Sequence, residues 1–169
     1  MYKYESVKEE YMTKWEITET ENKKALHKIR ATEKNIKMKF MREHLPIFAD
    51  MIKADAKKLR LYAFELPVRT ESDGTKYADV VLEIDDGGIP QENKMFVLEF
   101  KRKKVDSQSA VAQVLRYSDV IKKQLYRKKR VTPFVVATGY SEAELKLAKE
   151  QKVIPVRYDH KTGKMEIKT

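Results

Sequence analysis

Three residues stand at positions from which they could do chemistry together: Asp79, Glu99 and Lys101. Asp79 lies in one strand-like segment, and Glu99 and Lys101 lie in the next, after a Gly-Gly turn. Residues two apart in a strand point to the same face, so Glu99 and Lys101 should lie side by side while Phe100 faces away. Paired carboxylates can hold a divalent cation, and an ammonium group beside them can help to position a water. The three residues therefore indicate metal-dependent hydrolysis of phosphodiester bonds.

The elements that must position these residues follow from the hydrophobic pattern. The first sixty residues read as helix, with Thr32 as a plausible N-cap of one stretch and Pro46 at the start of another. Apolar and polar periodicity then predicts strands, a helix over 107–126, and a short helix that begins with the capping box of Ser141 and Glu144. The predicted strands are 61–68, 77–84, 95–101, 133–138, 153–158 and 164–167. This order predicts one mixed α/β domain over residues 1–169.

Composition narrows the class of protein and of partner. The chain has 169 residues and a net charge of +10, with 36 basic against 26 acidic residues. Such a surplus favours a polyanionic partner such as DNA, although a solvated lysine-rich surface would give the same count. Absence of cysteine excludes disulfides, zinc–thiolate sites and thiol nucleophiles. No apolar run is long enough for a membrane span and the start lacks a signal-peptide core, so we expect a cytoplasmic protein, in the host cytoplasm if it is viral.

A further pair of residues makes the pattern more specific. Gln113 and Tyr117 lie four apart on the helix that follows Glu99, and so share one side of it. With an acid on one strand, E-x-K on the next and Q-x-x-x-Y on the following helix, the chain resembles the PD-(D/E)XK nuclease superfamily, and in particular its RecB-like and NucS-like members, over about residues 30–140. The usual proline before the first acid is Ala78 here. The resemblance implies an Mg²⁺-dependent DNA nuclease with a restriction-endonuclease-like core over 31–169 and a helical extension over 1–30.

The resemblance also implies metal ligands. Asp79 and Glu99 would hold Mg²⁺ or Mn²⁺, and the backbone carbonyl of Phe100 would add a ligand. Family members place a further glutamate on the helix before the sheet. Glu33 fits that position best, with Glu43 and Glu21 as rivals.

Other site residues are expected around this metal. Lys101 would orient the attacking water or help to deprotonate it, and would offset charge on the phosphate. Gln113 and Tyr117 would look toward the site from the border of the apolar stripe that runs from Val111 to Leu125. Basic residues close to the motif would contact nucleic acid, namely Arg102, Lys103 and Arg116.

Several alternatives stay open at this point. Glu99 and Lys101 can form an exposed ion pair of little energetic value, and Tyr117 can be a core tyrosine. Asp85, which shares a strand face with Asp79, is a fallback ligand. A non-catalytic nucleic-acid-binding or assembly module is the rival function, and an RNA endonuclease is a third possibility. The aromatic stripe of Tyr4, Val7, Tyr11 and Trp15 suggests a homodimer contact.

Overall fold

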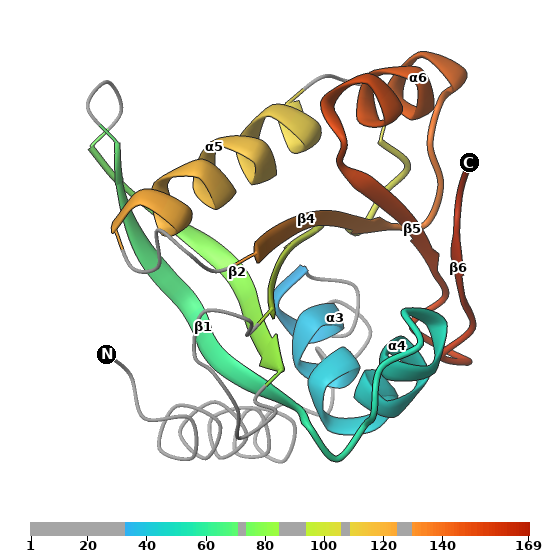
Figure 1. Cartoon of the computed structure of the whole chain (residues 1–169). Coiled ribbons are helices and arrows are strands. Elements are labelled where there is room, and N and C mark those ends of the chain that lie inside the picture. The colour runs from blue at the N-terminus through green and yellow to red at the C-terminus, as the bar shows by residue number, and fades with distance from the viewer. Residues whose placement is uncertain (1–32, 71–73, 85–93, 106–108, 125–129) are drawn as a thin grey trace, which may run out of the picture.

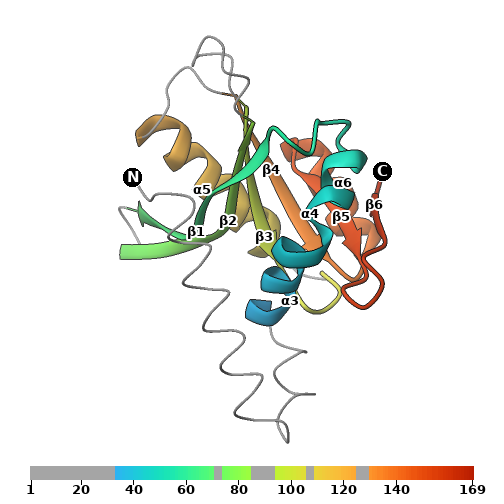
Figure 2. The same ribbon diagram turned by 90° about the horizontal axis from the view of Figure 1, so that it is seen from below.

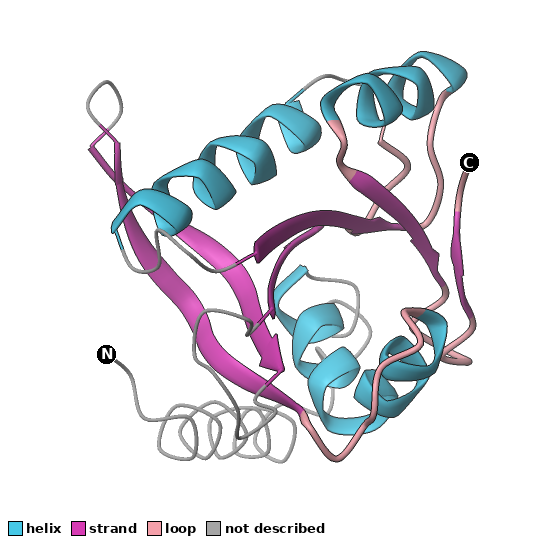
Figure 3. Cartoon of the chain, viewed as in Figure 1, coloured by secondary structure: helices cyan, strands magenta, loops and turns pink. Residues whose placement is uncertain are grey.

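A six-stranded mixed sheet in the order β1-β2-β3-β4-β5-β6 forms the centre of the molecule (Figure 3). The computed structural model describes residues 33–70, 74–84, 94–105, 109–124 and 130–169. Three antiparallel strands begin the sheet, and β3 then pairs in parallel with β4, which pairs in parallel with β5. Antiparallel β6 closes it. The strands are β1 (Leu59–Thr70), β2 (Gly74–Ile84), β3 (Lys94–Phe100), β4 (Arg130–Ala137), β5 (Ile154–Tyr158) and β6 (Met165–Ile167).

Helices cover both faces of this sheet (Figure 1). One face carries α3 (Glu33–Lys39), the π-helical turn η2 (Phe40–His44) and α4 (Leu45–Met51), and the other carries α5 (Ser109–Gln124) and α6 (Glu142–Gln151). Seen from below, α3 and α4 lie in front of the sheet (Figure 2). The expected α/β class, a mixed central sheet flanked by helices, is confirmed by this arrangement. None of the described helices has the length and apolar character that a membrane span requires.

Two apolar clusters account for the two helical layers. On the α3 side, Phe40, Phe48 and Phe100 are fully buried, and Phe40 meets the other two edge to face, with ring centroids 5.5 Å from Phe48 and 5.1 Å from Phe100. On the α5 side, Val111 and Val114 pack against the opposite face of the sheet. Since β4 is covered on both faces, its continuous apolar run is explained.

The proline and capping signals in the sequence lie at the starts of helices in the structure. Pro46 is the second residue of α4, where the absence of its N–H costs no helical hydrogen bond. Ser141 caps α6 by accepting a hydrogen bond from the Glu144 N–H at 3.3 Å. The predicted strands are confirmed to within three residues at each end, and β3 ends at Phe100, which leaves Lys101 just outside it. Thr32, the expected helical extension over 1–30 and its aromatic stripe lie outside the described residues.

Candidate active site

Asp79 and Glu99 lie at the point where β2 and β3 separate. The last paired residues of these strands are Val80 and Leu98, whereas β3 continues to pair with β4 as far as Phe100. The Phe100 N–H donates instead to Asp79 Oδ2 at 2.8 Å. A side-chain carboxylate thus takes the place of a strand partner, and this bond holds the acid in the fork between the two strands.

Glu99 is a buried acid with an unsatisfied oxygen. The residue is only 6% exposed, and within the described part of the chain its Oε2 has no hydrogen-bond partner. Burial, followed by the negative charge of Asp79, raises the pKa of Glu99 to about 8. A buried carboxylate oxygen beside a second carboxylate is unfavourable by itself and becomes favourable when a cation lies between them.

Lys101 connects this acid to helix α5. Its backbone N–H donates to the Val136 carbonyl at 2.9 Å, which fixes the chain directly after β3. Its Nζ lies 3.4 Å from Glu99 Oε1 and donates to Gln113 Oε1, also at 3.4 Å. The expected adjacency of Glu99 and Lys101 is therefore present, and the pair is largely shielded from solvent rather than exposed, because the Glu99 side chain is 8% exposed and the Lys101 side chain 27%.

Of the two expected helix residues, Gln113 contacts the motif through the Lys101 ammonium. Tyr117 is buried within the apolar cluster of α5 together with Val114 and Ile121. It therefore lies within the apolar cluster and not at the border of the apolar stripe, where it was expected. Arg116, which lies between Gln113 and Tyr117 in the sequence, is exposed.

A lysine that sequence reasoning did not assign reaches the same fork from α3. Lys37 Nζ lies 3.1 Å from Asp79 Oδ1 and 3.2 Å from Glu65 Oε1, and its side chain is only 5% exposed. Neither Lys37 nor Glu65 belongs to a recognisable spacing with Asp79. The one available signal was that Lys37 falls one helical turn after Glu33, on the face expected to supply a residue to the site.

Glu33 itself does not join the two acids. It is the exposed first residue of α3, and among the described residues no three histidine, cysteine or acidic side chains gather closely enough to hold a metal. Its rival Glu43 is turned toward Lys39 and His44, at 4.0 and 3.8 Å. Within the described residues, α3 presents Lys37 to Asp79. Glu21 and the fallback ligand Asp85 lie outside the described residues.

The remaining donor set fits a small divalent cation. Mg²⁺ is commonly bound by one or two carboxylates and completes its shell with water, so it does not need a third acid. Asp79 and Glu99 would supply that pair, and Glu99 Oε2 has no hydrogen-bond partner among the described residues. Phe100 lies between the fork and Lys101, with its N–H already given to Asp79.

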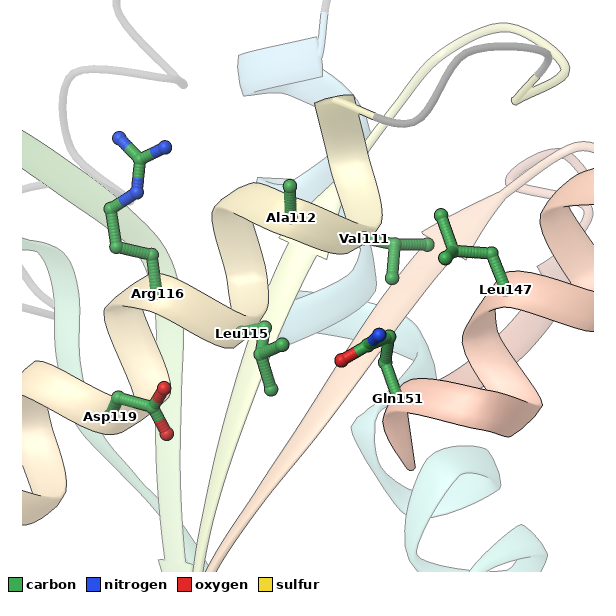
Figure 4. A pocket seen from close by; sticks show the side chains of 7 residues that line it. All are labelled: Val111, Ala112, Leu115, Arg116, Asp119, Leu147 and Gln151. Carbon is green, nitrogen blue, oxygen red and sulfur yellow. The ribbon is translucent and has the colours of Figure 1, made fainter.

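The expected phosphate-binding residues lie on two different surfaces. Arg102 and Lys103 are exposed immediately after Lys101. Arg116 instead lines a hollow of about 370 Å³ between α5 and α6 (Figure 4). That hollow shares no lining residue with the fork, so it is a separate feature. Its lining residues are Val111, Ala112, Leu115, Arg116, Asp119, Leu147 and Gln151.

No family model matches the sequence, and no curated protein matches it either. Among solved structures, the chain is similar to a repair endonuclease from Pyrococcus abyssi, with 24% identity over 68% of this chain and 44% of that chain, at a TM-score of 0.47. It is also similar to EndoMS in a dsDNA complex, with 18% identity over 57% of this chain and 36% of that chain, at a TM-score of 0.39.

A third similar structure is an XisH family protein from Nostoc punctiforme, with 12% identity over 75% of this chain and 94% of that chain, at a TM-score of 0.42. This chain spans less than half the length of the two endonucleases. These similarities are low in sequence identity and partial in coverage.

Proposed function

We propose that this protein is a metal-dependent nuclease that hydrolyses DNA phosphodiester bonds at the fork between β2 and β3. The observation that carries the proposal is Glu99, a carboxylate only 6% exposed whose Oε2 has no partner among the described residues. It lies beside the second acid Asp79 and the ammonium of Lys101. A module that only binds nucleic acid gains nothing from clustered carboxylates near phosphate, because they repel it.

Each residue of the fork has a role that follows from its contacts. Asp79 and Glu99 would hold Mg²⁺ or Mn²⁺, and the Phe100 carbonyl is a further candidate ligand. Such an ion, when bound, supplies Lewis-acid polarisation of the phosphate and lowers the pKa of a coordinated water. Lys101 orients the attacking water and offsets charge that develops on the phosphate. Gln113 accepts a hydrogen bond from Lys101 and so limits where its ammonium can lie.

Substrate is brought to the fork by charge. Arg102 and Lys103 are exposed and follow Lys101 directly in the chain, so they lie next to the proposed position of the scissile phosphate. A net charge of +10 speeds the approach of a polyanion. Binding should therefore weaken as salt rises, whereas the chemical step should depend on the fork residues.

A cleavage assay with matched variants tests the proposal. Supercoiled plasmid and labelled single-stranded and flapped oligonucleotides would be incubated with Mg²⁺, Mn²⁺ or EDTA. Wild type should cut only with metal, and both Glu99→Gln and Lys101→Ala should fold, bind DNA and lose at least about a hundredfold in rate. The control is Glu166→Gln, which removes an exposed acid on β6 that pairs with Arg157 at 3.6 Å.

Three results would count against the proposal. Cleavage by Glu99→Gln at the wild-type rate would remove the assigned site. Cleavage that persists in EDTA would remove the metal requirement. Binding of DNA without cleavage of any substrate would favour the non-catalytic module instead.

A further inference from the structure

The fork between β2 and β3 already contains a cation that belongs to the protein. The Lys37 ammonium lies 3.1 Å from Asp79 Oδ1 and 3.2 Å from Glu65 Oε1, at ordinary ion-pair distances for both. With its side chain 5% exposed, this charge is held inside the protein and is poorly placed to meet solvent or a polyanion directly. Its partners are therefore Asp79 of the fork and Glu65 of β1.

Glu65, the second partner of Lys37, has an unusual backbone conformation. Its φ is +47°, in the left-handed region, where a residue with a Cβ is strained by about 1–2 kcal/mol. Phe64 packs in the α3-side cluster and Leu66 in the α5-side cluster. The Glu65 carboxylate nevertheless reaches Lys37, which belongs to α3. Strain of this kind persists only where surrounding contacts maintain it, and it is concentrated at functional sites.

The carboxylates of Asp79 and Glu99 differ in how many of their oxygens have a protein donor. Asp79 has the Lys37 ammonium on Oδ1 and the Phe100 N–H on Oδ2. Glu99 has Lys101 on Oε1, and none of the described residues donates to its Oε2. In sites with two ions, the metals lie about 3.5–4 Å apart and are bridged by shared carboxylates. The Lys37 ammonium already lies on Asp79 Oδ1, an oxygen that a second ion would need.

We propose that Lys37 is a resident cation of this site, held by Glu65 and Asp79, and that the fork consequently accepts a single divalent ion on the side of Glu99 Oε2. The inference rests on the proposed metal-dependent function and specifies its metal content. Lys37 repels the incoming ion while it neutralises acids that would otherwise repel each other. Metal affinity is thereby kept lower than two or three bare carboxylates would give.

Mn²⁺ titration of the full chain without DNA tests this directly. Heat of binding and the EPR signal of free Mn²⁺ would give the affinity and the number of ions bound. Wild type should bind one ion per chain. Lys37→Gln, which keeps a hydrogen-bond donor, and Lys37→Met, which keeps the apolar stem, should each bind Mn²⁺ at least about tenfold tighter or take a second ion, because the repelling charge is gone. Lys37→Arg should stay within about threefold of wild type, since the charge is retained.

The matched control is Lys39→Gln, which removes a charge from the same helix. Lys39 pairs with Glu43 at 4.0 Å, and its side chain is 32% exposed, so its loss should change Mn²⁺ affinity by less than twofold. A cooperative thermal transition would establish that each variant is folded. A lysine with only a structural role would give the opposite sign for Lys37→Gln, because a loosened site binds metal more weakly.

The possible failures can be told apart. Two ions on the wild-type protein, or weaker Mn²⁺ binding by folded Lys37→Gln, would overturn the resident cation and leave the nuclease proposal standing. An equal gain from Lys39→Gln would also overturn it, since the effect would then come from net charge alone. No Mn²⁺ binding by the wild type would overturn both proposals. The wild-type ion count decides the matter even if the Lys37 variants do not fold.

Discussion

The backbone N–H of Phe100 donates to the Asp79 carboxylate at 2.8 Å, at the place where β2 stops pairing with β3. This one bond makes Asp79 both a part of the sheet and a part of the candidate site. Its other oxygen meets Lys37 at 3.1 Å, so each oxygen of this carboxylate has a protein donor. Substitutions at Asp79 should consequently affect folding as well as chemistry.

We expect Asp79→Ala to lower the free energy of unfolding by about 1–3 kcal/mol at pH 7, because the Phe100 N–H and Lys37 each lose a partner. Asp79→Asn should cost less, since its amide oxygen can still accept the Phe100 N–H. Both should lose DNA cleavage. Urea unfolding followed by circular dichroism measures the difference. Asp119→Ala, on the exposed side of α5, is the control and should change stability by less than about 0.5 kcal/mol. Equal stabilities for Asp79→Ala and wild type would contradict the prediction.

Stability without metal should depend on the ionisation of Glu99. Its pKa is near 4.5 in the unfolded chain and about 8 in the folded protein, so the folded state favours the protonated acid. The contribution to stability is complete below pH 4.5, decreases as the pH rises, and is lost above about pH 8. Glu99→Gln should remove this decline and be more stable than wild type by roughly 1–3 kcal/mol at pH 9.

Thermal unfolding in EDTA between pH 5 and pH 9 measures this effect. The control, Glu166→Gln, should follow the wild-type pH profile, because Glu166 is 47% exposed. If Glu99→Gln shows the same decline as the wild type, Glu99 is not the acid responsible.

Lys101 and Gln113 should differ in how much they matter to catalysis. Lys101→Ala removes the charge beside Glu99, and we expect the single-turnover rate of DNA cleavage to decrease by about 10²–10⁴-fold with DNA affinity nearly unchanged. Gln113→Ala removes only an acceptor 3.4 Å from that ammonium and should cost about tenfold or less. A larger loss for Gln113→Ala than for Lys101→Ala would mean that Gln113 contacts substrate itself. Quench-flow cleavage together with fluorescence anisotropy separates rate from binding.

The left-handed backbone at Glu65 gives a prediction about stability alone. Ala and Gly at this position both delete the carboxylate, so comparing the two isolates the backbone. Because glycine adopts positive φ without strain, Glu65→Gly should be more stable than Glu65→Ala by about 1 kcal/mol. Arg60 is an exposed position of the same strand, and its φ is not positive. There the alanine variant should be more stable than the glycine variant by about 0.5–1 kcal/mol. Chemical unfolding of the four variants decides it, and an alanine preference at both positions would contradict it.

Much of the site could be read from local patterns, because those patterns are themselves local. Glu99 and Lys101 share a face since strand residues alternate, and that relation needs no knowledge of the rest of the chain. Gln113 was found through its helical spacing and does contact Lys101. Tyr117 has the same spacing, but how deeply a helix face is buried depends on the sheet beneath it, and the tyrosine lies in the core.

By itself, the sequence determined the mixed α/β order of elements, the strand that carries the E-x-K pair and the basic balance of the molecule. The tertiary structure decided what surrounds Asp79. Lys37 is forty-two residues away in sequence and Glu65 owes its direction to a left-handed φ, and neither property has a local signature. Burial and the divergence of β2 from β3 are long-range results of packing, and they determine that α3 brings a lysine, rather than a glutamate, to the acids.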